Sequence, residues 1–357
     1  MTKLGWMSLH TAALWLGHQS DDLYIDSLTM TGGVGPRFLL VNQHEVALEM
    51  NTALPLSVVI FRRTYDDNEH RTRTAQAILQ DHASLIGDNR DIWLYFNNEP
   101  NPPAGMNDTG KRGFWRSVID HAIEVYKLCS ENGYTAIGPN FGAKWPLMED
   151  AYLWNDPEYL PRLIAASNQY RQPLGFHIYA PGRIGLLPDP ADNILHTPSG
   201  EWRITPEFFT ENIDRMIRLG MKACVITECG YDNVAGYGGA VHHLNIAAGD
   251  MADDMRRLAS YFEPYKNIVH GATLFCWQPA PGQEWDHFDL RNFTDAEGNF
   301  LHLLGKHDWT AFGDWDRGDV FKETSGPTPV IFWRRWLLAL ANVLDQLAKR
   351  LTQIATK

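Results

Sequence analysis

The feature that most constrains this chain of 357 residues is a repeated alternation of short apolar segments with longer amphipathic ones. Each short segment has the length and nearly continuous apolar character of a strand that is buried on both faces. Each longer segment is long enough to cross from one parallel strand to the next as a helix. Strands are predicted at residues 4–10, 37–42, 56–62, 91–97, 134–140, 173–179, 222–228 and 271–277.

The amphipathic segments between these strands complete the pattern. Helices are predicted at residues 69–86, 111–132, 206–219 and 247–265. Eight such units predict an α/β fold, a (β/α)8 barrel, and one domain of this size is ordinary for that fold. We place the barrel in residues 1–327, including a long loop at 278–327 that follows the last strand. Because strand-to-helix loops build the functional face of such barrels, this loop is expected to line the substrate site.

The C-terminal segment, residues 328–357, is predicted to form an extended helix. Its apolar residues follow a heptad-like stripe: Leu340, Leu344, Leu347, Leu351 and Ile354. Such a stripe fits either the eighth helix of the barrel or a seam for self-association or an attached domain.

Composition excludes several classes of function. The formal net charge is −12 and no block of Lys or Arg occurs, so no nucleic-acid partner is expected. The four cysteines lack metal-binding spacing, and no apolar run reaches 18 residues, so neither a zinc site nor a membrane span is predicted. The first ten residues lack the features of a secretory leader, which predicts a cytoplasmic protein, although a secreted protein with its leader removed would look the same.

Two glutamates follow buried strands. Glu99 follows the strand at 91–97, and Glu228 ends the strand at 222–228. In a parallel barrel both side chains rise from the same rim. Two carboxylates that face each other at such a rim can cleave a glycosidic bond, one as a proton donor and one as a nucleophile or base.

The motifs around these glutamates resemble those of the clan-A glycoside hydrolases, which are retaining (β/α)8 enzymes. "NEP" at 98–100 resembles the acid/base motif after the fourth strand of that clan, and "ITECG" around Glu228 resembles its nucleophile strand. The resemblance covers roughly residues 4–277 and implies that Glu99 is the acid/base and Glu228 the nucleophile. It also implies that Asn98 bonds the 2-hydroxyl of a sugar.

Aromatic residues extend the resemblance. "HIY" at 177–179 is similar to the His and Tyr pair of the clan, which implies that Tyr179 orients the nucleophile and that His177 lies near the acid/base. Trp277, at the end of the last strand, resembles the aromatic floor of the subsite in which the bond breaks.

Side-chain alternation gives an independent expectation for the strands that carry these residues. It places Gly175, His177 and Tyr179 on one face of their strand. It also places Cys224, Ile226 and Glu228 on one face of theirs, and we expect both faces to line the interior of the barrel. On the fourth strand, Asn98 and Glu99 are adjacent and would point in opposite directions. The backbone at 97–100 is therefore predicted to be irregular.

One departure from the clan concerns arginine. The clan often carries an arginine at the end of the second strand, where this chain has "VNQH" at 41–44. Arg62 and Arg63 follow the third strand instead, and we favour Arg62 as the residue that supports the site. A salt bridge at the rim is the alternative role for either arginine.

Other polar residues are weaker candidates. His242 and His243 lie in a Gly-rich segment and are interpreted as loop residues. Asp286, His287 and Asp289 could cradle a cation, but we predict neither a metal nor a cofactor.

These residues together predict a retaining β-glycoside hydrolase that acts on an oligosaccharide, a polysaccharide or another glycoside. Two alternatives stay open. One is a transglycosylase that shares the covalent intermediate, and the other is a catalytically silent barrel that binds carbohydrate.

Overall fold

A computed structural model describes the strands of the sheet, seven α-helices and the loop that follows the fourth strand. The described residues are 7–11, 37–41, 44–53, 58–63, 69–142, 150–180, 194–197, 200–203, 206–231, 253–254, 257–258, 260–265, 267–277, 294–295 and 298–299.

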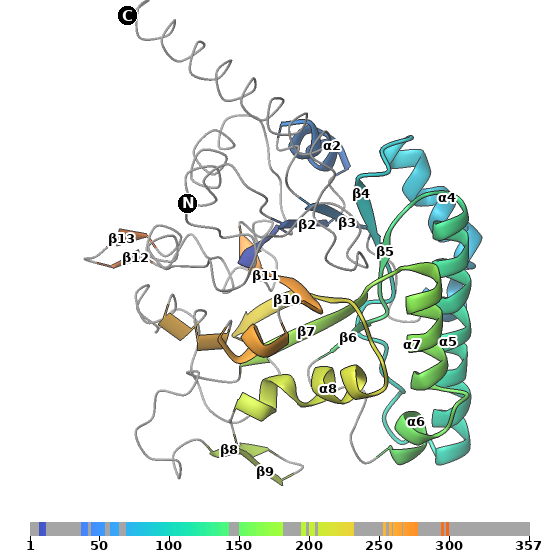
Figure 1. The fold of residues 1–357 in the computed structure, drawn as a ribbon, viewed down its shortest axis with the longest axis vertical. Coiled ribbons are helices and arrows are strands. Elements are labelled where there is room, and N and C mark those ends of the chain that lie inside the picture. The colour runs from blue at the N-terminus through green and yellow to red at the C-terminus, as the bar shows by residue number, and fades with distance from the viewer. Residues whose placement is uncertain are drawn as a thin grey trace, which may run out of the picture.

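Nine parallel β segments form one sheet that closes on itself (Figure 1). In chain order they are β1 (Met7–Thr11), β2 (Arg37–Val41), β3 (Val58–Arg62), β4 (Ile92–Tyr95), β5 (Ala136–Ile137), β6 (Asn140–Phe141), β7 (Leu174–Ala180), β10 (Cys224–Tyr231) and β11 (Val269–Trp277). Their spatial order is β5-β4-β3-β2-β1-β11-β10-β7-β6. Since β5 and β6 are two pieces of the stretch 136–141, the two ends of this order are one strand. The eight-stranded barrel predicted from the sequence is confirmed.

Helices cover the outer face of the sheet. They are α2 (His44–Ala53), α3 (Glu69–Thr72), α4 (Ala75–Ile86), α5 (Asp108–Glu131), α6 (Ala151–Asn155), α7 (Leu160–Tyr170) and α8 (Pro206–Arg218), with a 3-10 turn at Glu263–Tyr265. In Figure 1, α4, α5 and α7 stand side by side, and α5 packs against both of the others. Two short hairpins pair β8 (Ile194–Thr197) with β9 (Gly200–Arg203) and β12 (Thr294–Asp295) with β13 (Gly298–Asn299).

Two of the predicted helices differ in detail from the structure. The single helix expected over 69–86 is wrong, because α3 ends at Thr72 and a new helix begins after Thr74. The Thr74 hydroxyl accepts a hydrogen bond from the N–H of Ala77 at 3.1 Å and so caps α4. Of the helix predicted at 247–265, the described residues 253–254, 257–258 and 260–262 are helical.

The apolar core has two layers. An inner cluster fills the barrel and consists of Val58, Ile60, Trp93, Tyr95, Ile137 and Val225. A larger outer cluster joins the other face of the strands to the helices and includes Phe61, Leu94, Trp115, Leu163 and Ile226. Burying each large apolar side chain contributes about 1.5–3 kcal/mol to the free energy of unfolding. The two layers therefore fix which face of each strand points inward.

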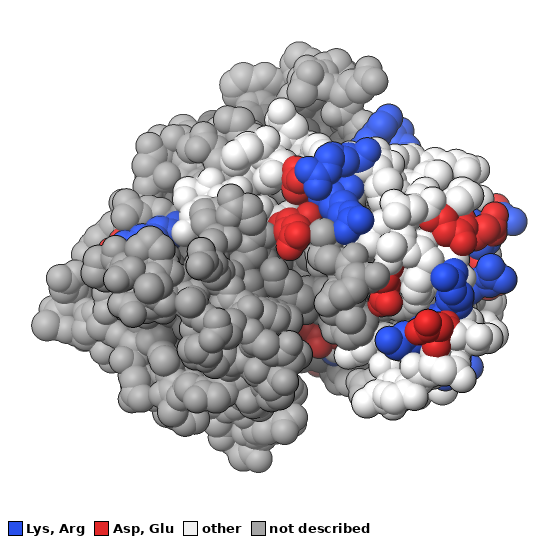
Figure 2. All heavy atoms as spheres, turned by 90° about the horizontal axis from the view of Figure 1, so that it is seen from below, with Lys and Arg blue, Asp and Glu red and all other residues white. Residues whose placement is uncertain are grey.

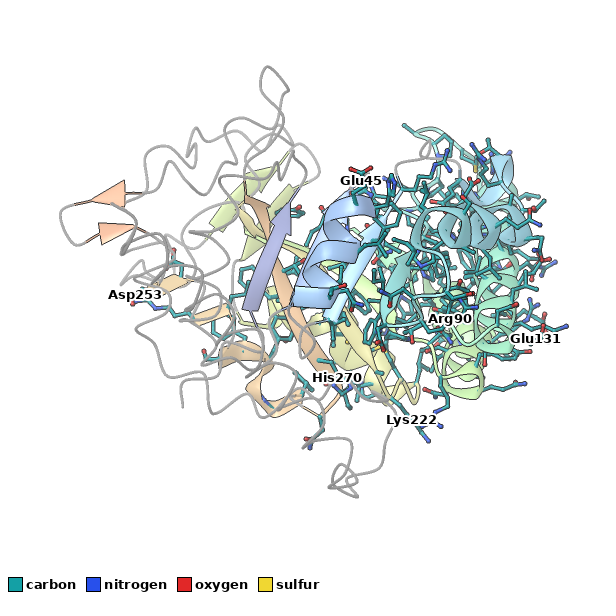
Figure 3. The ribbon with its side chains drawn as sticks, turned by 90° about the horizontal axis from the view of Figure 1, so that it is seen from above. Glu45, Arg90, Glu131, Lys222, Asp253 and His270 are labelled. Atoms are coloured by element: carbon teal, nitrogen blue, oxygen red, sulfur yellow. The ribbon has the colours of Figure 1, made fainter. Side chains whose placement is uncertain are left out.

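The strands all run toward one end of the barrel. In Figure 3, Glu45, which follows β2, lies on the upper side, whereas Arg90, Lys222 and His270, which precede or begin strands, lie on the lower side. Glu99 follows β4, and Glu228 lies in the second half of β10. Both glutamates therefore belong to the same end of the barrel as Glu45.

Charges of both signs are mixed on the described surface. Figure 2 shows acidic and basic side chains next to one another on one face. Two exposed pairs are Arg162 with Asp120, at 2.6 Å, and Arg90 with Asp88, at 3.2 Å. Among the described residues, no helix is long and apolar enough to cross a membrane.

Several predictions lie outside the described residues. They concern the helix at 328–357, most of the loop at 278–327, the histidines at 242–243 and the possible cation ligands at 286–289. The division of the chain at residue 327 therefore stays a prediction.

Candidate active site

Glu228 reaches the interior of the barrel through an irregularity in β10. The pairing of β10 with β7 shifts register between Ile226 and Glu228. Cys224 and Ile226 belong to the outer core and Val225 to the inner cluster, so the expectation that Cys224, Ile226 and Glu228 share the inner face is wrong. Regular alternation would have pointed Glu228 toward the helices, and the irregular step turns it inward.

An arginine and a tyrosine hold the carboxylate of Glu228. Nη1 of Arg62 donates to Oε1 at 2.9 Å, and the hydroxyl of Tyr179 donates to Oε2 at 2.6 Å. The side chains of Arg62 and Glu228 are only 15% and 8% exposed. A guanidinium and a hydroxyl that donate to the same buried carboxylate stabilise its ionised form.

The charge on Arg62 is secured by its neighbours. Burial alone would lower the pKa of Arg62, but the nearby carboxylates of Glu228 and Glu99 raise it above the ordinary value. Arg62 therefore stays a cation inside the barrel. Arg63, in contrast, points outward and pairs with Asp81 at 3.2 Å, with 40% of its side chain exposed.

Glu99 follows β4 on a strained stretch of backbone. Asn97 and Glu99 both have positive φ, at 50° and 41°, a conformation that is costly for residues other than glycine. The structure at 97–100 is thus irregular, as the adjacency of Asn98 and Glu99 predicted. Hydrogen bonds from Glu99 N to the Asn140 carbonyl and from Asn140 N to the Asn97 carbonyl, both 2.9 Å, hold this stretch against the next strand.

A buried carboxylate also supports this stretch from the outer side. Oε2 of Glu69, in α3, accepts a hydrogen bond from the N–H of Asn97 at 3.0 Å. Glu69 is only 5% exposed. Because this N–H cannot continue the sheet ladder once β4 has ended, Glu69 replaces the missing strand partner.

His177 lies between the two glutamates. Its Nδ1 is 2.6 Å from Oε1 of Glu99 and 3.3 Å from Oε2 of Glu228, and its side chain is 1% exposed. Its Nε2 is 2.8 Å from the hydroxyl of Tyr95. One imidazole ring therefore joins the residue that follows β4 to the residue in β10.

Below Glu99 and Glu228, a layer of polar side chains crosses the barrel. The hydroxyl of Thr227 donates to Oδ1 of Asn140 at 2.8 Å, and Nδ2 of Asn140 donates to the carbonyl of Phe96 at 2.7 Å. The Thr273 hydroxyl donates to the carbonyl of Thr227. Gly175 leaves room for this layer, since a Cβ there would lie 1.8 Å from Oδ1 of Asn140. The layer ties the irregular strand ends of the site to one another.

The structure brings most of the sequence-predicted residues together. Arg62, Glu99, His177, Tyr179 and Glu228 form one connected set of contacts. Asn98 joins it through Tyr95, whose hydroxyl donates to Oδ1 of Asn98 at 2.6 Å. The backbone of Trp277 ends β11, but its side chain lies outside what the structure describes.

Tyr95 is the residue that the motifs missed. It contacts Asn98, His177 and Arg62, and it is 3% exposed. The signal that could have found it is alternation, because Tyr95 lies two residues after the interior residue Trp93 at the carboxyl end of a barrel strand.

The described residues offer no metal site. Within the part of the chain that the structure describes, no group of three or more His, Cys, Asp and Glu side chains is placed to hold a metal ion. The contacts of Glu99 and Glu228 are instead with His177, Arg62 and Tyr179. This set of groups can exchange protons, stabilise a carboxylate and present a second carboxylate to a reacting atom.

The fold and the site together define a class of protein: a closed parallel barrel that carries two glutamates and a bridging histidine at one end. No protein-family model and no curated protein matches the sequence. Solved structures that are similar include the catalytic domain of a mannanase from Streptomyces sp. SirexAA-E, with TM-score 0.49 and 13% identity, covering 85% of this chain and 87% of that one.

Two further structures are similar. A mannotriose complex of the β-mannanase from Thermomonospora fusca has TM-score 0.47 and 12% identity, over 87% of this chain and 92% of that chain. A β-glucosidase from Exiguobacterium marinum has TM-score 0.39 and 16% identity, over 72% of this chain and 77% of that chain. Glycosidases are thus among the structures that this chain resembles.

Proposed function

We propose that this protein is a retaining β-glycoside hydrolase in which Glu99 is the acid/base and Glu228 the nucleophile. The observation that carries the proposal is the position of His177 Nδ1, 2.6 Å from Glu99 and 3.3 Å from Glu228. Two oxygens that contact one nitrogen at these distances lie no more than about 6 Å apart. This upper limit includes the roughly 5–5.5 Å between the carboxyl groups of retaining enzymes and lies below the roughly 6.5–9.5 Å of inverting ones.

The different surroundings of the two glutamates support different roles. Glu228 is 8% exposed and accepts hydrogen bonds from a cation and a hydroxyl, which keep it ionised and ready to attack. Glu99 is 45% exposed, so a departing group or an incoming water molecule can reach it. A nucleophile needs a buried carboxylate that stays ionised, and an acid/base needs a carboxyl group that the leaving group and water can reach.

The reaction then proceeds by two displacements. In the first, a carboxylate oxygen of Glu228 bonds to the anomeric carbon while the glycosidic C–O bond breaks and the leaving oxygen takes the proton of Glu99. In the second, a water oxygen attacks the same carbon, Glu99 takes the proton of that water, and the bond to Glu228 breaks. Both carboxyl groups return to their starting states, and no cofactor enters either step.

Two substrate contacts follow from the resemblance to the clan-A glycoside hydrolases. Asn98 would donate to the sugar 2-hydroxyl, and Trp277 would stack beneath the ring whose bond breaks. The substrate class is an oligosaccharide, a polysaccharide or another glycoside. A transglycosylase would use the same residues with an acceptor sugar in place of water, and a silent carbohydrate-binding barrel would bind without turnover.

The test is to trap the covalent intermediate. An activated 2-deoxy-2-fluoro β-glycoside, of the sugar that a panel of aryl glycosides selects, slows both steps and should leave a label that peptide mass spectrometry assigns to Glu228. A Glu228→Gln variant should take up no label. Turnover of the aryl glycoside with a label on a different residue contradicts the proposed roles. Binding without turnover supports the silent barrel, and product analysis with an added acceptor sugar identifies a transglycosylase.

A further inference from the structure

Tyr95 contacts both halves of the candidate site. Its hydroxyl oxygen lies 2.6 Å from Oδ1 of Asn98 and 2.8 Å from Nε2 of His177. The face of its ring lies against the guanidinium of Arg62, with Cζ 5.0 Å from the ring centroid. The hydroxyl therefore touches the acid/base side, while the ring supports the arginine that holds Glu228.

The direction of each hydrogen bond follows from counting protons. Burial raises the pKa of Tyr95 well above its ordinary value, so the hydroxyl keeps its single proton. Oδ1 of Asn98 is an acceptor only, and the hydroxyl therefore donates to it. With its proton committed, the Tyr95 oxygen can only accept from Nε2 of His177, so that nitrogen must carry a proton.

The hydrogen bond between Nδ1 of His177 and Glu99 then requires one further proton. Nδ1 lies 2.6 Å from Oε1 of Glu99, and an ionised carboxylate is an acceptor only. For a hydrogen bond to form, either Nδ1 carries a second proton or Glu99 is protonated and donates to Nδ1. Glu228 does not need this proton, because it already accepts from Arg62 and Tyr179. One proton therefore belongs to the pair of His177 and Glu99.

We propose that Tyr95 is a positioning residue whose hydroxyl fixes His177 with a proton on Nε2, so that one mobile proton is held between Nδ1 and Glu99. The same hydroxyl fixes the amide of Asn98, whose NH2 group is turned away from Tyr95 and can donate to a substrate hydroxyl. The kinetic role rests on the proposed function, since the held proton would be the one given to the leaving group. The arrangement of protons is a property of the protein without substrate.

The first experiment needs no substrate. Nitrogen-15 NMR of the histidine side chains, with His177 assigned by a His177→Gln variant, reports which ring nitrogen carries a proton. The expected result is a protonated Nε2 in the wild type and a change to an Nδ1-protonated ring in Tyr95→Phe, which has lost the acceptor for Nε2. A wild-type His177 that is neutral with its proton on Nδ1 overturns the proposal. So does a Tyr95→Phe spectrum that does not differ from the wild type.

The second experiment asks whether the held proton is used. Tyr95→Phe keeps the ring against Arg62 and should lower kcat by about 10- to 100-fold on glycosides with a poor leaving group, less than the loss expected for Glu99 itself. With a 2,4-dinitrophenyl leaving group, which needs little protonation, the loss should stay below about threefold. Equal losses for both leaving groups, or none, overturn the proposal.

A matched control removes the same kind of group elsewhere. Tyr134 also stacks on an arginine, with Cζ of Arg90 3.7 Å from its ring centroid, and its hydroxyl donates to the Gly87 carbonyl at 2.8 Å. Tyr134 belongs to the outer core, so Tyr134→Phe should leave kcat and the His177 spectrum unchanged. A wild type that hydrolyses no glycoside contradicts the proposed function alone, because the NMR result still decides the role of Tyr95.

Discussion

Arg62 and Glu228 form an ion pair across the interior of the barrel, with Nη1 and Oε1 2.9 Å apart. The two residues are 166 positions apart in the sequence, and three strands separate β3 from β10 in the sheet. Neither side chain has more than 15% of its surface exposed. The pair therefore links opposite sides of the barrel where the proposed reaction takes place.

Removing one partner of this pair should destabilise the protein. Arg62→Met leaves the carboxylate of Glu228 buried without its cation, which costs about 3–5 kcal/mol of the free energy of unfolding. The matched variant Arg63→Met breaks an exposed pair with Asp81 and should cost no more than about 1 kcal/mol. Urea unfolding of both variants measures the difference. Equal losses would show that the interior pair does not form.

Removing the Tyr179 hydroxyl should slow the attack by Glu228. Tyr179→Phe deletes a 2.6 Å hydrogen bond to the carboxylate, and a bond to a charged group contributes about 1.5–3 kcal/mol, or roughly 10- to 150-fold in kcat. Steady-state kinetics on an aryl β-glycoside checks this value. Tyr265→Phe removes a tyrosine hydroxyl that donates to the carboxylate of Asp214 at 3.1 Å, outside the set of site contacts, and should have no effect on kcat. A loss in both variants would argue against a specific role for Tyr179.

Gly175 should tolerate no side chain. In Gly175→Ala the new Cβ would lie 1.8 Å from Oδ1 of Asn140, so the polar layer below the site must shift at a cost of about 1–3 kcal/mol. Gly113→Ala adds the same methyl group inside α5, where no atom lies within 4 Å, and should stabilise the protein by about 0.5–1 kcal/mol. Thermal unfolding distinguishes the two, and a stable Gly175→Ala would mean that the layer can move freely.

Two buried histidines should make stability depend on pH. Burial lowers the pKa of His82 and of His121 to about 4, whereas histidine in an unfolded chain titrates near 6.5. Between these values the unfolded chain binds protons that the folded protein does not, so the free energy of unfolding falls as the pH drops. Each histidine should cost about 2 kcal/mol at pH 5 relative to pH 7.

Urea unfolding at both pH values tests this expectation on His82, which packs between Phe61 and Tyr134. In His82→Leu, the difference in stability between pH 7 and pH 5 should shrink by about 2 kcal/mol. Leu79→Ala, on the same helix, should lower stability equally at both values. A pH dependence in His82→Leu as large as in the wild type would show that His82 is not the group that takes up the proton.

The strands could be predicted because each is a short apolar run that must be buried on both faces. Residues such as those of "IWLYF" at 92–96 have few other places in a soluble fold, and all eight runs lie in the sheet. The helices α2, α6 and α7 were missed. α6 has only five residues, too few to show a helical period, and tertiary packing rather than pattern decides such segments.

Only the part of the candidate site that depends on residue type and on the position of strand ends could be predicted. Glu99 and Glu228 stand out because each follows an apolar run. The inward turn of Glu228 depends on a register shift after Ile226, which alternation alone cannot reveal. The role inferred for Tyr95 depends on partners at positions 62, 98 and 177, and only the closed barrel brings these positions together.

The most direct test of the proposed mechanism is the stereochemistry of the first product. Proton NMR during hydrolysis of an aryl β-glycoside observes the anomeric proton before mutarotation, so it reports the configuration that the enzyme releases. Double displacement through Glu228 predicts that the β anomer appears first and the α anomer only later. An α anomer as the first product would contradict the covalent intermediate and the roles given to Glu99 and Glu228.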